Sequence, residues 1–309
     1  MTKTAMMKLR IAFAFVAMAS PLFAAAQAPP PAAPTQSPME WQRKHDMALK
    51  YPTLWDFYVA LKQDASKRQS SAPSAVPDWS GLWTTATGGG GALFRPGPGG
   101  IAPKLTPATV AALKVGDERN AKGLIYDENL SKCGPAGFPR WMGEPFLREY
   151  IPTPSETWLI SEQVNETRRV YTDGRDHPSA RDRYPLPEGD SIGFWDGQKL
   201  VIHTNQLQAR SMGRNQPTQS DKMETVEIWE KVDANTILVD MWLSDPTLYM
   251  ESWYVQRKYI KVPNPDKSIR VIYWICQENP NNDVVETPDG NTDYAPFTFT
   301  KKADEKSNH

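Results

Sequence analysis

Residues 223–245 read METVEIWEKVDANTILVDMWLSD, and this stretch decides the fold. Apolar and polar side chains alternate on either side of Asp233-Ala234-Asn235, and alternation with a period of two is typical of a strand with one buried face. Asp and Asn favour turns because their short side chains bond to nearby backbone groups. The stretch therefore predicts a β-hairpin that turns at residues 233–235.

Similar strand patterns lie on both sides of this hairpin. They occupy residues 156–164 and 167–173, joined at Asn165-Glu166; 191–207, folded at Asp196-Gly197; and 252–262 and 268–279. Strands at this regular spacing are typical of an antiparallel meander that closes into a barrel or folds as a sandwich. We expect a mainly β domain over residues 78–302, with a barrel as the first choice and a β-sandwich as the alternative.

The first 26 residues have the features of a secretory signal peptide. Lys3, Lys8 and Arg10 precede an apolar run, and Ala24 and Ala26 fit the small-residue rule for cleavage. A run of about ten apolar residues is too short to cross a bilayer, and no later stretch is long enough. The sequence predicts an exported, periplasmic protein with no membrane span after the signal is removed.

A helical arm is expected between the signal and the β domain. Residues 27–38 form a Pro-rich linker, 39–69 the arm, and 70–77 a second linker. Apolar side chains recur along the arm at helical spacing, with a break near Pro52. Such an arm packs on the β domain or pairs two chains into a homodimer, and the sequence leaves both open.

Two other segments lie outside the strand pattern. Residues 106–122 read as an inserted helix, with Thr106 as its cap and Pro107 in its first position. The charged tail 303–309 is expected to be disordered. The GGGG run at 88–91 lacks the Lys-Ser/Thr pair that a phosphate-binding loop requires. We therefore interpret it as a flexible loop.

Charge and composition narrow the class of partner. The chain has 35 Lys and Arg against 36 Asp and Glu, a net charge of -1, and no basic footprint for nucleic acid. Its 11 Trp indicate a large β core or an aromatic-lined pocket, because a buried indole needs a partner for its N–H. We expect a small-molecule ligand or substrate and no nucleic acid.

The chain has two cysteines, Cys133 and Cys276. In an oxidising compartment two cysteines most often pair, so we expect a Cys133–Cys276 disulfide. Neither cysteine belongs to a CxxC motif or to a paired-histidine spacing, which argues against a metal held by them.

Alternation along residues 158–164 predicts one shared face for Trp158, Ile160, Glu162 and Val164. On the partner strand Arg168 stands opposite Glu162, and a charged pair facing the interior must be well hydrogen-bonded. Such a pair has a structural role in the fold or lines a pocket, and both interpretations stay open.

The stretch YTDGRDHP, residues 171–178, is the best candidate for chemistry. Asp173 and Gly174 make the turn, Arg175 is suited to hold an anion in bidentate fashion, and His177 exchanges a proton near neutral pH. Asp190 and Glu162 are the candidate carboxylates. The alternative is a plain turn in which Asp173 caps the backbone and Arg175 pairs with an acid such as Asp190.

Two weaker patterns need a structural context that the sequence does not supply. GDSIG at 189–193 matches the nucleophile elbow of serine hydrolases with Ser191 as nucleophile, but the elbow requires a following helix and a strand pattern follows here. A metal site built from His177, Asp173, Asp190 and His203 has no supporting ligand spacing. We expect neither a metal nor another cofactor.

Several motifs together resemble one large family of exported, functionally uncharacterised proteobacterial and acidobacterial proteins. They are PDWSGLW (77–83), CGPAGFPRWM (133–142), the block from 162 to 178 that ends in TDGRDHP, GDSIGFWDGQKLVIHT (189–204), SDKMETVEIWEKVD (220–233), SDPTLY (244–249) and YWICQEN (273–279). The resemblance covers roughly residues 77–280. It implies a β-rich, calycin-like barrel, and it supports the disulfide because both cysteines lie in these motifs.

The chain departs from that family pattern at two places. It reads WDGQK where the family more often has WEGDT, and it carries His203 where an acidic residue is common. If that acid is functional in the relatives, the chemistry of this chain differs there. Gly81-Leu82-Trp83 is also similar to the opening strand of lipocalins, which agrees with the barrel.

Two functions from different classes follow. The first is a periplasmic barrel that binds an apolar or aromatic small molecule through Arg168, Tyr171, Trp195, His203, Trp229 and Trp242. The second is a cofactor-independent lyase, isomerase or hydrolase in which His177 and a carboxylate transfer protons while Arg175 clamps an anion. The enzyme hypothesis requires Asp173, Arg175, His177 and Glu162 or Asp190 to converge on one cavity.

Overall fold

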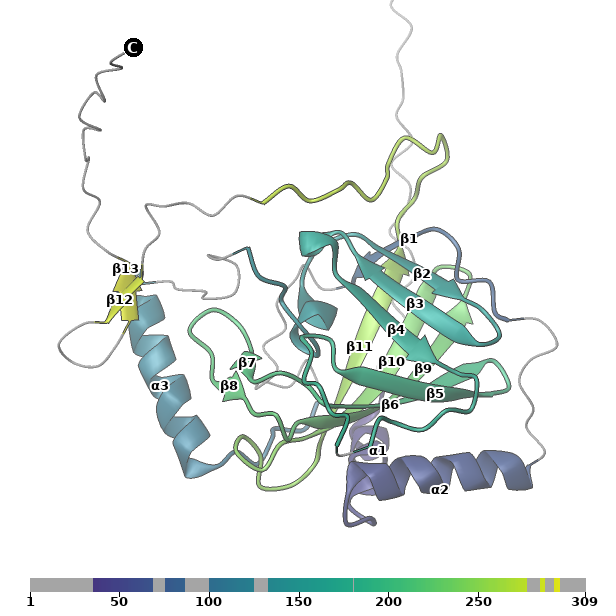
Figure 1. Ribbon diagram of the computed structural model, residues 1–309, viewed down its shortest axis with the longest axis horizontal. Coiled ribbons are helices and arrows are strands. Elements are labelled where there is room, and N and C mark those ends of the chain that lie inside the picture. The colour runs from purple at the N-terminus through teal and green to yellow at the C-terminus, as the bar shows by residue number, and fades with distance from the viewer. Residues whose placement is uncertain are drawn as a thin grey trace, which may run out of the picture. The chain divides into compact units, whose positions relative to one another are not determined.

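The structure of the 309-residue chain is a computed structural model (Figure 1). It describes residues 36–68, 76–86, 100–124, 133–179, 181–276, 284–286 and 292–294. The expected signal peptide, the Pro-rich linker up to residue 35, the GGGG run and the charged tail 303–309 lie outside these residues.

Nine strands of the described chain close into a barrel, which confirms the first-choice fold and excludes the sandwich (Figure 1). Around the barrel the order is β1-β11-β10-β9-β6-β5-β4-β3-β2, and β2 pairs again with β1. The strands are β1 (Leu82–Thr85), β2 (Arg148–Pro152), β3 (Glu156–Ser161), β4 (Thr167–Tyr171), β5 (Asp190–Asp196), β6 (Lys199–Asn205), β9 (Glu224–Asp233), β10 (Thr236–Ser244) and β11 (Trp253–Lys261).

All barrel pairs are antiparallel except one. β4 and β5 run parallel, with Val170 opposite Ser191 and Tyr171 opposite Ile192. Parallel neighbours cannot be joined by a tight hairpin, so the chain between them must return along the barrel before β5 begins. This connection, residues 172–189, contains the DGRDHP turn.

The hairpin of β9 and β10 forms where the sequence predicts it. Thr236 pairs with Asp233, and the Asn235 amide donates to Asp233 Oδ1 at 2.7 Å, which closes the turn. Short pairs lie outside the barrel: β7 (Arg210–Ser211) with β8 (Thr218–Gln219), and β12 (Val284–Glu286) with β13 (Thr292–Tyr294).

The inserted helix is also present, as α3 (Pro107–Ala121). The Thr106 hydroxyl accepts from the Thr109 amide and Pro107 is the first residue, as predicted. The described chain also contains two short 3-10 helices, η1 (Arg140–Gly143) and η2 (Gln163–Asn165). No helix in the described ranges has the length and apolar character needed to cross a membrane.

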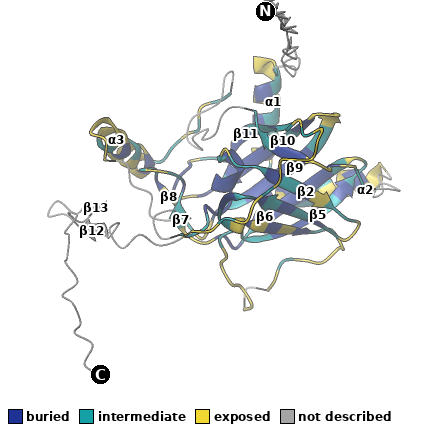
Figure 2. Cartoon of the chain, turned by 90° about the horizontal axis from the view of Figure 1, so that it is seen from above, coloured by how far each residue is buried: buried dark blue, intermediate teal, exposed yellow. Residues whose placement is uncertain are grey.

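The barrel interior is filled by its own aromatic side chains, and Figure 2 shows that burial concentrates in the barrel strands. Trp229 stacks on Tyr259 with ring centroids 5.6 Å apart, and both rings contact Tyr150 edge-on. Trp79 packs against Trp229 from another side, at 6.1 Å. All four side chains are at most 2% exposed. The 11 Trp therefore largely serve a packed core.

The helical arm is two helices, α1 (Pro38–Ala48) and α2 (Leu54–Lys67), with the expected break around Pro52. Both pack on the outside of the barrel (Figure 1). Phe57 of α2 meets Trp242 of β10 edge-on at 5.1 Å, and Trp41 of α1 meets Tyr254 of β11 at 5.2 Å. The apolar stripe of the arm is thus buried against the barrel. Pairing of two chains through this arm stays a prediction.

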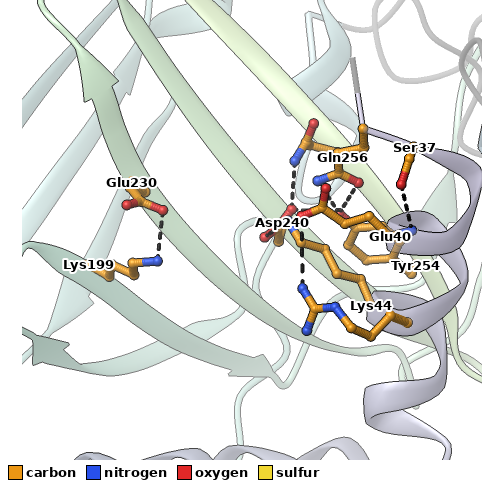
Figure 3. A network of polar contacts seen from close by, with 10 residues as sticks. Ser37, Glu40, Lys44, Lys199, Glu230, Asp240, Tyr254 and Gln256 are labelled. Atoms are coloured by element: carbon orange, nitrogen blue, oxygen red, sulfur yellow. Dashed lines mark hydrogen bonds and ion pairs between the residues drawn. The ribbon is translucent and has the colours of Figure 1, made fainter. Parts of the chain in front are cut away.

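Polar contacts fix α1 in place, as Figure 3 shows for the groups around Asp240. Lys44 Nζ lies 2.6 Å from Asp240 Oδ2, while Tyr254 and Gln256 donate to Asp240 Oδ1 at 2.6 and 2.8 Å. The Trp242 indole N–H donates to the Lys44 carbonyl at 2.8 Å. Apolar packing and the part-buried Asp240 carboxylate together hold the arm in one position on the barrel.

The disulfide is formed as predicted. Cys133 and Cys276 have their Cα atoms 5.7 Å apart and close a loop with a sequence separation of 143 residues. In the chain-entropy description, a loop of this length lowers the entropy of the unfolded chain by an amount worth about 4–5 kcal/mol.

The strand predicted at 268–279 is wrong for residues 268–276, which have no ladder partner. β1 already pairs with β2 on one side and β11 on the other, so the closed barrel offers no edge for another strand. Trp274 is held instead by Asn165, whose side-chain amide bonds both its N–H and its carbonyl. Ile272, Tyr273 and Ile275 are exposed.

The shared face predicted for residues 158–164 is confirmed for Trp158 and Ile160 and wrong beyond Ser161. Thr157, Leu159 and Ser161 point inward, and Trp158 and Ile160 point outward. β3 ends at Ser161, and Val164 and Asn165 then adopt left-handed backbone conformations with φ of 51° and 56°. The alternation was therefore extended past the end of the strand, into a turn.

Candidate functional site

The connection between β4 and β5 carries His177 to the outer face of β6. Residues 186–189 are anchored beside the end of β6, because the Leu186 amide donates to the Gln206 carbonyl at 3.0 Å. Gly189 has φ +66°, and a Cβ there would lie 2.6 Å from the Asn205 carbonyl oxygen. A glycine is required at this close approach. It delivers the chain to Asp190, the first residue of β5.

His203 lies in β6, on the face that α2 covers. Leu200 and Ile202 belong to the interior core, whereas Val201 packs in the layer beneath the arm. By the same alternation His203 points outward, where its ring centroid is 5.2 Å from Trp55 and 5.6 Å from Tyr58. Its side chain is fully buried. A single strand thus separates the packed core from a buried imidazole.

Three side chains form a hydrogen-bonded chain at this place. His177 Nδ1 bonds to Asp190 Oδ1, and His177 Nε2 lies 2.8 Å from His203 Nδ1. On the far side, His203 Nε2 is 3.8 Å from Glu224 Oε2, a distance too long for a hydrogen bond. The order Asp190–His177–His203 is a relay, with Glu224 beyond its end.

The direction of each hydrogen bond in this relay follows from the Asp190 carboxylate at its start. A carboxylate only accepts, so His177 uses its Nδ1–H toward Asp190, and its Nε2 is left to accept from the Nδ1–H of His203. His203 Nε2 then carries a lone pair, and it is buried with no hydrogen-bond partner among the described residues. Burial, the largest influence, lowers the pKa of His203 and favours the neutral ring.

A pocket of about 380 Å³ opens at the end of the relay. Its lining joins the arm to the barrel and consists of Thr53, Trp55, Asp176, His177, Arg183, His203, Asn205 and Glu224. Trp55 from α2 lies beside both imidazoles and is 37% exposed, which places it at the pocket mouth. Asn205 Oδ1 is a second buried polar atom without a hydrogen-bond partner in the described chain. An unprotonated base and an unsatisfied acceptor therefore meet in one small cavity.

Asp173 and Arg175 do not join His177 in this pocket. They pair with each other, with Arg175 Nη2 2.6 Å from Asp173 Oδ2, and Arg175 stacks on Tyr171 at 4.0 Å. Both are solvent-accessible, and the hydrogen bond from Arg175 lowers the pKa of the Asp173 carboxyl. The structure thus brings together His177 and Asp190 of the predicted set. The predicted convergence of Asp173 and Arg175 with them in one cavity is wrong, and the expected anion clamp is absent from this pocket.

Glu162 does not pair with Arg168. It precedes η2, and partial burial raises the pKa of its carboxyl. Arg168 instead forms a bidentate ion pair inside the barrel with Glu227 of β9, at 3.0 and 2.6 Å. The partner of Arg168 was predicted wrongly, because Glu162 lies beyond the end of β3.

The other residues predicted to bind a ligand lie in three different environments. Trp195 packs against Trp79 in the interior core, beside Trp229. Trp242 lies outside the barrel under the arm. Tyr171 borders a second pocket on the outer face of β3 and β4. Of this set only His203 reaches the relay.

Ser191 is not placed as a serine nucleophile. It lies within β5, its side chain is buried in the barrel, and its hydroxyl oxygen accepts from Arg168 Nε at 3.0 Å. A nucleophile elbow needs a sharp turn into a helix, and here the strand continues to Asp196.

Residues that the sequence did not single out complete the site. Trp55, Glu224, Asn205 and Arg183 come from four separate segments. Asn205 had one usable signal, because it lies two positions after His203 and so shares its face of the strand. The other three are brought in by the arm, by β9 and by the connection. A second unpredicted group, Glu166 and Glu188, lines the other pocket.

Over the described residues, no group of three or more His, Cys, Asp or Glu is placed to hold a metal ion. No family model, curated protein or solved structure matches the chain.

Proposed function

We propose that this protein is an exported enzyme that removes a proton from a small molecule bound between the helical arm and the barrel, with His203 as the general base. One observation carries the proposal: His203 Nε2 is buried, has no hydrogen-bond partner within the described structure and borders a pocket. Buried polar atoms are nearly always hydrogen-bonded, so an unsatisfied imidazole nitrogen marks a place where a ligand is expected.

The relay gives this base a way to hold the proton it accepts. When Nε2 takes a proton, the positive charge is stabilised through Nδ1–H by His177, and His177 is oriented by Asp190. Glu224 lies 3.8 Å from Nε2 and adds a negative charge next to the new imidazolium. His203 is the catalytic residue of the proposal, and His177 and Asp190 are positioning residues.

The pocket also changes where ligand binding is expected. The interior is occupied by Trp229, Tyr259 and Tyr150, so an apolar or aromatic molecule bound in the barrel would have to displace packed core. The outer pocket has an aromatic wall in Trp55 and polar groups at its base, the combination typical of small-molecule sites. Small-molecule binding is retained in the proposal, and its place moves to this pocket.

Export to the periplasm and membership of the exported family belong to the same proposal. The signal-like first 26 residues and the combined motifs support them. The disulfide adds support because such bonds persist in oxidising compartments.

A general-base probe tests the proposed function without knowledge of the natural substrate. 5-Nitrobenzisoxazole opens when a base takes its C3 proton: the C–H and N–O bonds break, a nitrile forms, and the proton remains on the base. We expect His203→Gln to lower kcat/KM for this probe by about 10²-fold, at the lower end of what a positioned base contributes. His177→Gln is expected to reduce the rate less, because the base itself remains.

His45→Gln is the matched control. His45 is also buried, but it lies in α1 and contacts Glu251, away from the pocket. The wild-type rate should fall on the acid side with the pKa of His203, below the ordinary histidine value of about 6.5. Equal rates for wild type and His203→Gln, or a loss in His45→Gln as large as in His203→Gln, would overturn the proposal.

A further inference from the structure

A second pocket lies on the outer face of β3 and β4 and shares Asp190, but neither histidine, with the relay. Its volume is about 560 Å³. Its lining consists of Pro135, Trp158, Val164, Asn165, Glu166, Thr167, Arg169, Tyr171, Leu186, Pro187, Glu188, Gly189, Asp190 and Ser191. Two of these residues, Glu166 and Glu188, have no part in the proposed proton transfer.

The carboxyl groups of Glu166 and Glu188 are buried and short of donors. Glu166 is 6% exposed, and its Oε1 accepts from the Gly137 amide at 2.6 Å. Glu166 Oε2 and both oxygens of Glu188 are buried and accept from no N–H or hydroxyl donor among the residues that the structure describes. Three unsatisfied carboxyl oxygens therefore converge on one pocket. An unsatisfied buried acceptor costs about 1–3 kcal/mol and more when charged, so the arrangement favours a donor-rich ligand.

The two carboxyls also hold a proton between them. Burial, the largest influence, raises the pKa of both groups, and the charge of Glu166 raises that of Glu188 further. Two carboxyls in contact cannot both ionise at low cost, so they share one proton. The surrounding cations Arg140, Arg168 and Arg210 act in the opposite direction without reversing the shift.

We propose that this pocket binds a primary amine on an apolar or aromatic body, with its ammonium group replacing the proton shared by Glu166 and Glu188. An ammonium carries three N–H donors and no acceptor, which matches the three unsatisfied oxygens in number and charge. A hydroxyl has one donor, and a quaternary ammonium has none. The geometry therefore selects a protonated primary amine over both.

The walls suit the rest of such a molecule. Leu186, Pro187 and Pro135 give an apolar surface, and Trp158 adds an aromatic one. The charged groups that line or border the pocket are Arg169, stacked on Trp158 at 4.2 Å; Arg175, paired with Asp173; Asp190, bound to His177; and Arg210, which donates to the Pro135 carbonyl. Arg140, Arg168 and Arg210 lie close enough to act on the carboxyl pair, and the pair supplies the negative charge at the base of the pocket.

Binding should release the shared proton. Because burial and mutual repulsion raise the pKa of the pair, the empty pair holds a proton more strongly than separate carboxyls do, and the bound ammonium takes the place of that proton. Affinity for the amine therefore increases as the pH rises toward the raised pKa of the pair, and the measured enthalpy depends on the ionisation enthalpy of the buffer. This signature needs no variant of the protein.

The test uses 2-phenylethylamine and isothermal titration calorimetry on the full chain at pH 7.5, in phosphate and in HEPES, neither of which contains a primary amine. We expect saturable binding with release of up to one proton, no detectable binding of 2-phenylethanol, and at least tenfold weaker binding of trimethyl(2-phenylethyl)ammonium. Tenfold corresponds to about 1.4 kcal/mol. Equal affinity for the amine and either analogue, no saturable binding, or an enthalpy independent of the buffer would overturn the proposal.

Glu188→Gln and Glu162→Gln form a matched pair of variants. Glu188→Gln removes the shared proton at nearly constant volume and is expected to abolish proton release and to weaken binding at least tenfold. Glu162 is a nearby carboxyl outside the pocket lining, so Glu162→Gln should bind like wild type. Unchanged binding by Glu188→Gln contradicts the proposal. Because Glu188 lies outside the relay, 5-nitrobenzisoxazole opening by this variant should match wild type, which separates the two sites.

Discussion

Neighbouring residues of β6 face two buried polar clusters that differ in one respect. Thr204 points into the barrel, where its hydroxyl accepts from Arg168 at 2.6 Å, and His203 points outward beneath α2. Arg168 also bonds to Ser191 and twice to Glu227, and the Trp229 indole donates to Glu227 at 2.9 Å. The inner cluster is satisfied within the chain, whereas the outer cluster ends in an unsatisfied nitrogen.

This difference separates groups that hold the fold from groups that await a ligand. A buried ion pair with all its hydrogen bonds made has no capacity left for a substrate, and it imposes one packing arrangement. An imidazole whose second nitrogen has no partner next to a pocket has that capacity. We therefore assign Arg168 and Glu227 to the structure of the barrel and His203 to chemistry.

The largest expected effect comes from breaking the inner cluster. Arg168→Met leaves the Glu227 carboxylate buried without its cation, and we expect the free energy of unfolding to fall by about 3–5 kcal/mol. Urea unfolding followed by tryptophan fluorescence measures it. The double variant Arg168→Met/Glu227→Leu should recover most of the loss, since apolar replacement of both partners of a buried ion pair is often neutral.

A loss below about 1 kcal/mol in Arg168→Met would show that water reaches Glu227 and that the inner cluster is not closed. The folded fraction of this variant should still open 5-nitrobenzisoxazole. Loss of that activity with the fold intact would contradict the division between the two faces of β6.

Lowering the pH is expected to have a smaller effect on the free energy of unfolding, through His203 of the outer cluster. The pKa of His203 is lowered in the folded state, so below about pH 6.5 the unfolded chain binds a proton that the folded chain does not. The neutral His203 ring therefore does not reduce the free energy of unfolding at higher pH. As the pH falls below 6.5, protonation of the unfolded chain lowers the free energy of unfolding by at most about 1.4 kcal/mol per pH unit.

The difference in unfolding free energy between wild type and His203→Gln isolates this contribution. This difference should stay constant above pH 7. From pH 6.5 to 5.5 the wild type should lose stability relative to His203→Gln. The Glu166–Glu188 pair changes the free energy of unfolding with pH in the opposite direction, because its pKa values are raised. Both proteins contain this pair, so its effect cancels in the difference between them. A difference that moves the other way would mean that folding stabilises the imidazolium.

Much of the barrel follows from local pattern. The hairpin at 233–235 and the Thr106 cap appear where predicted, because turn and cap residues act within a few positions of the chain. The disulfide follows from the count of cysteines and the expected compartment. The strand expected at 268–276 fails for a non-local reason, since the barrel closes without it.

The site was less predictable, and its geometry shows why. His177 and His203 are 26 positions apart and meet only because β4 and β5 run parallel, which sends the connection back along the barrel. An antiparallel meander, the pattern expected from the sequence, contains no such return. The anion clamp failed for a local reason, because Arg175 satisfies Asp173 two residues away.

The most direct test of the central claim is nitrogen-15 NMR of the histidine side chains between pH 5 and 8. We predict that His203 is neutral at pH 7, with its proton on Nδ1, an Nε2 shift typical of an unprotonated nitrogen, and a pKa below 6.5. We also predict that His177 is protonated at Nδ1, toward Asp190. A His203 that is protonated at Nε2 at pH 7, or one with a pKa above 6.5, would leave no base in the pocket and would contradict the account.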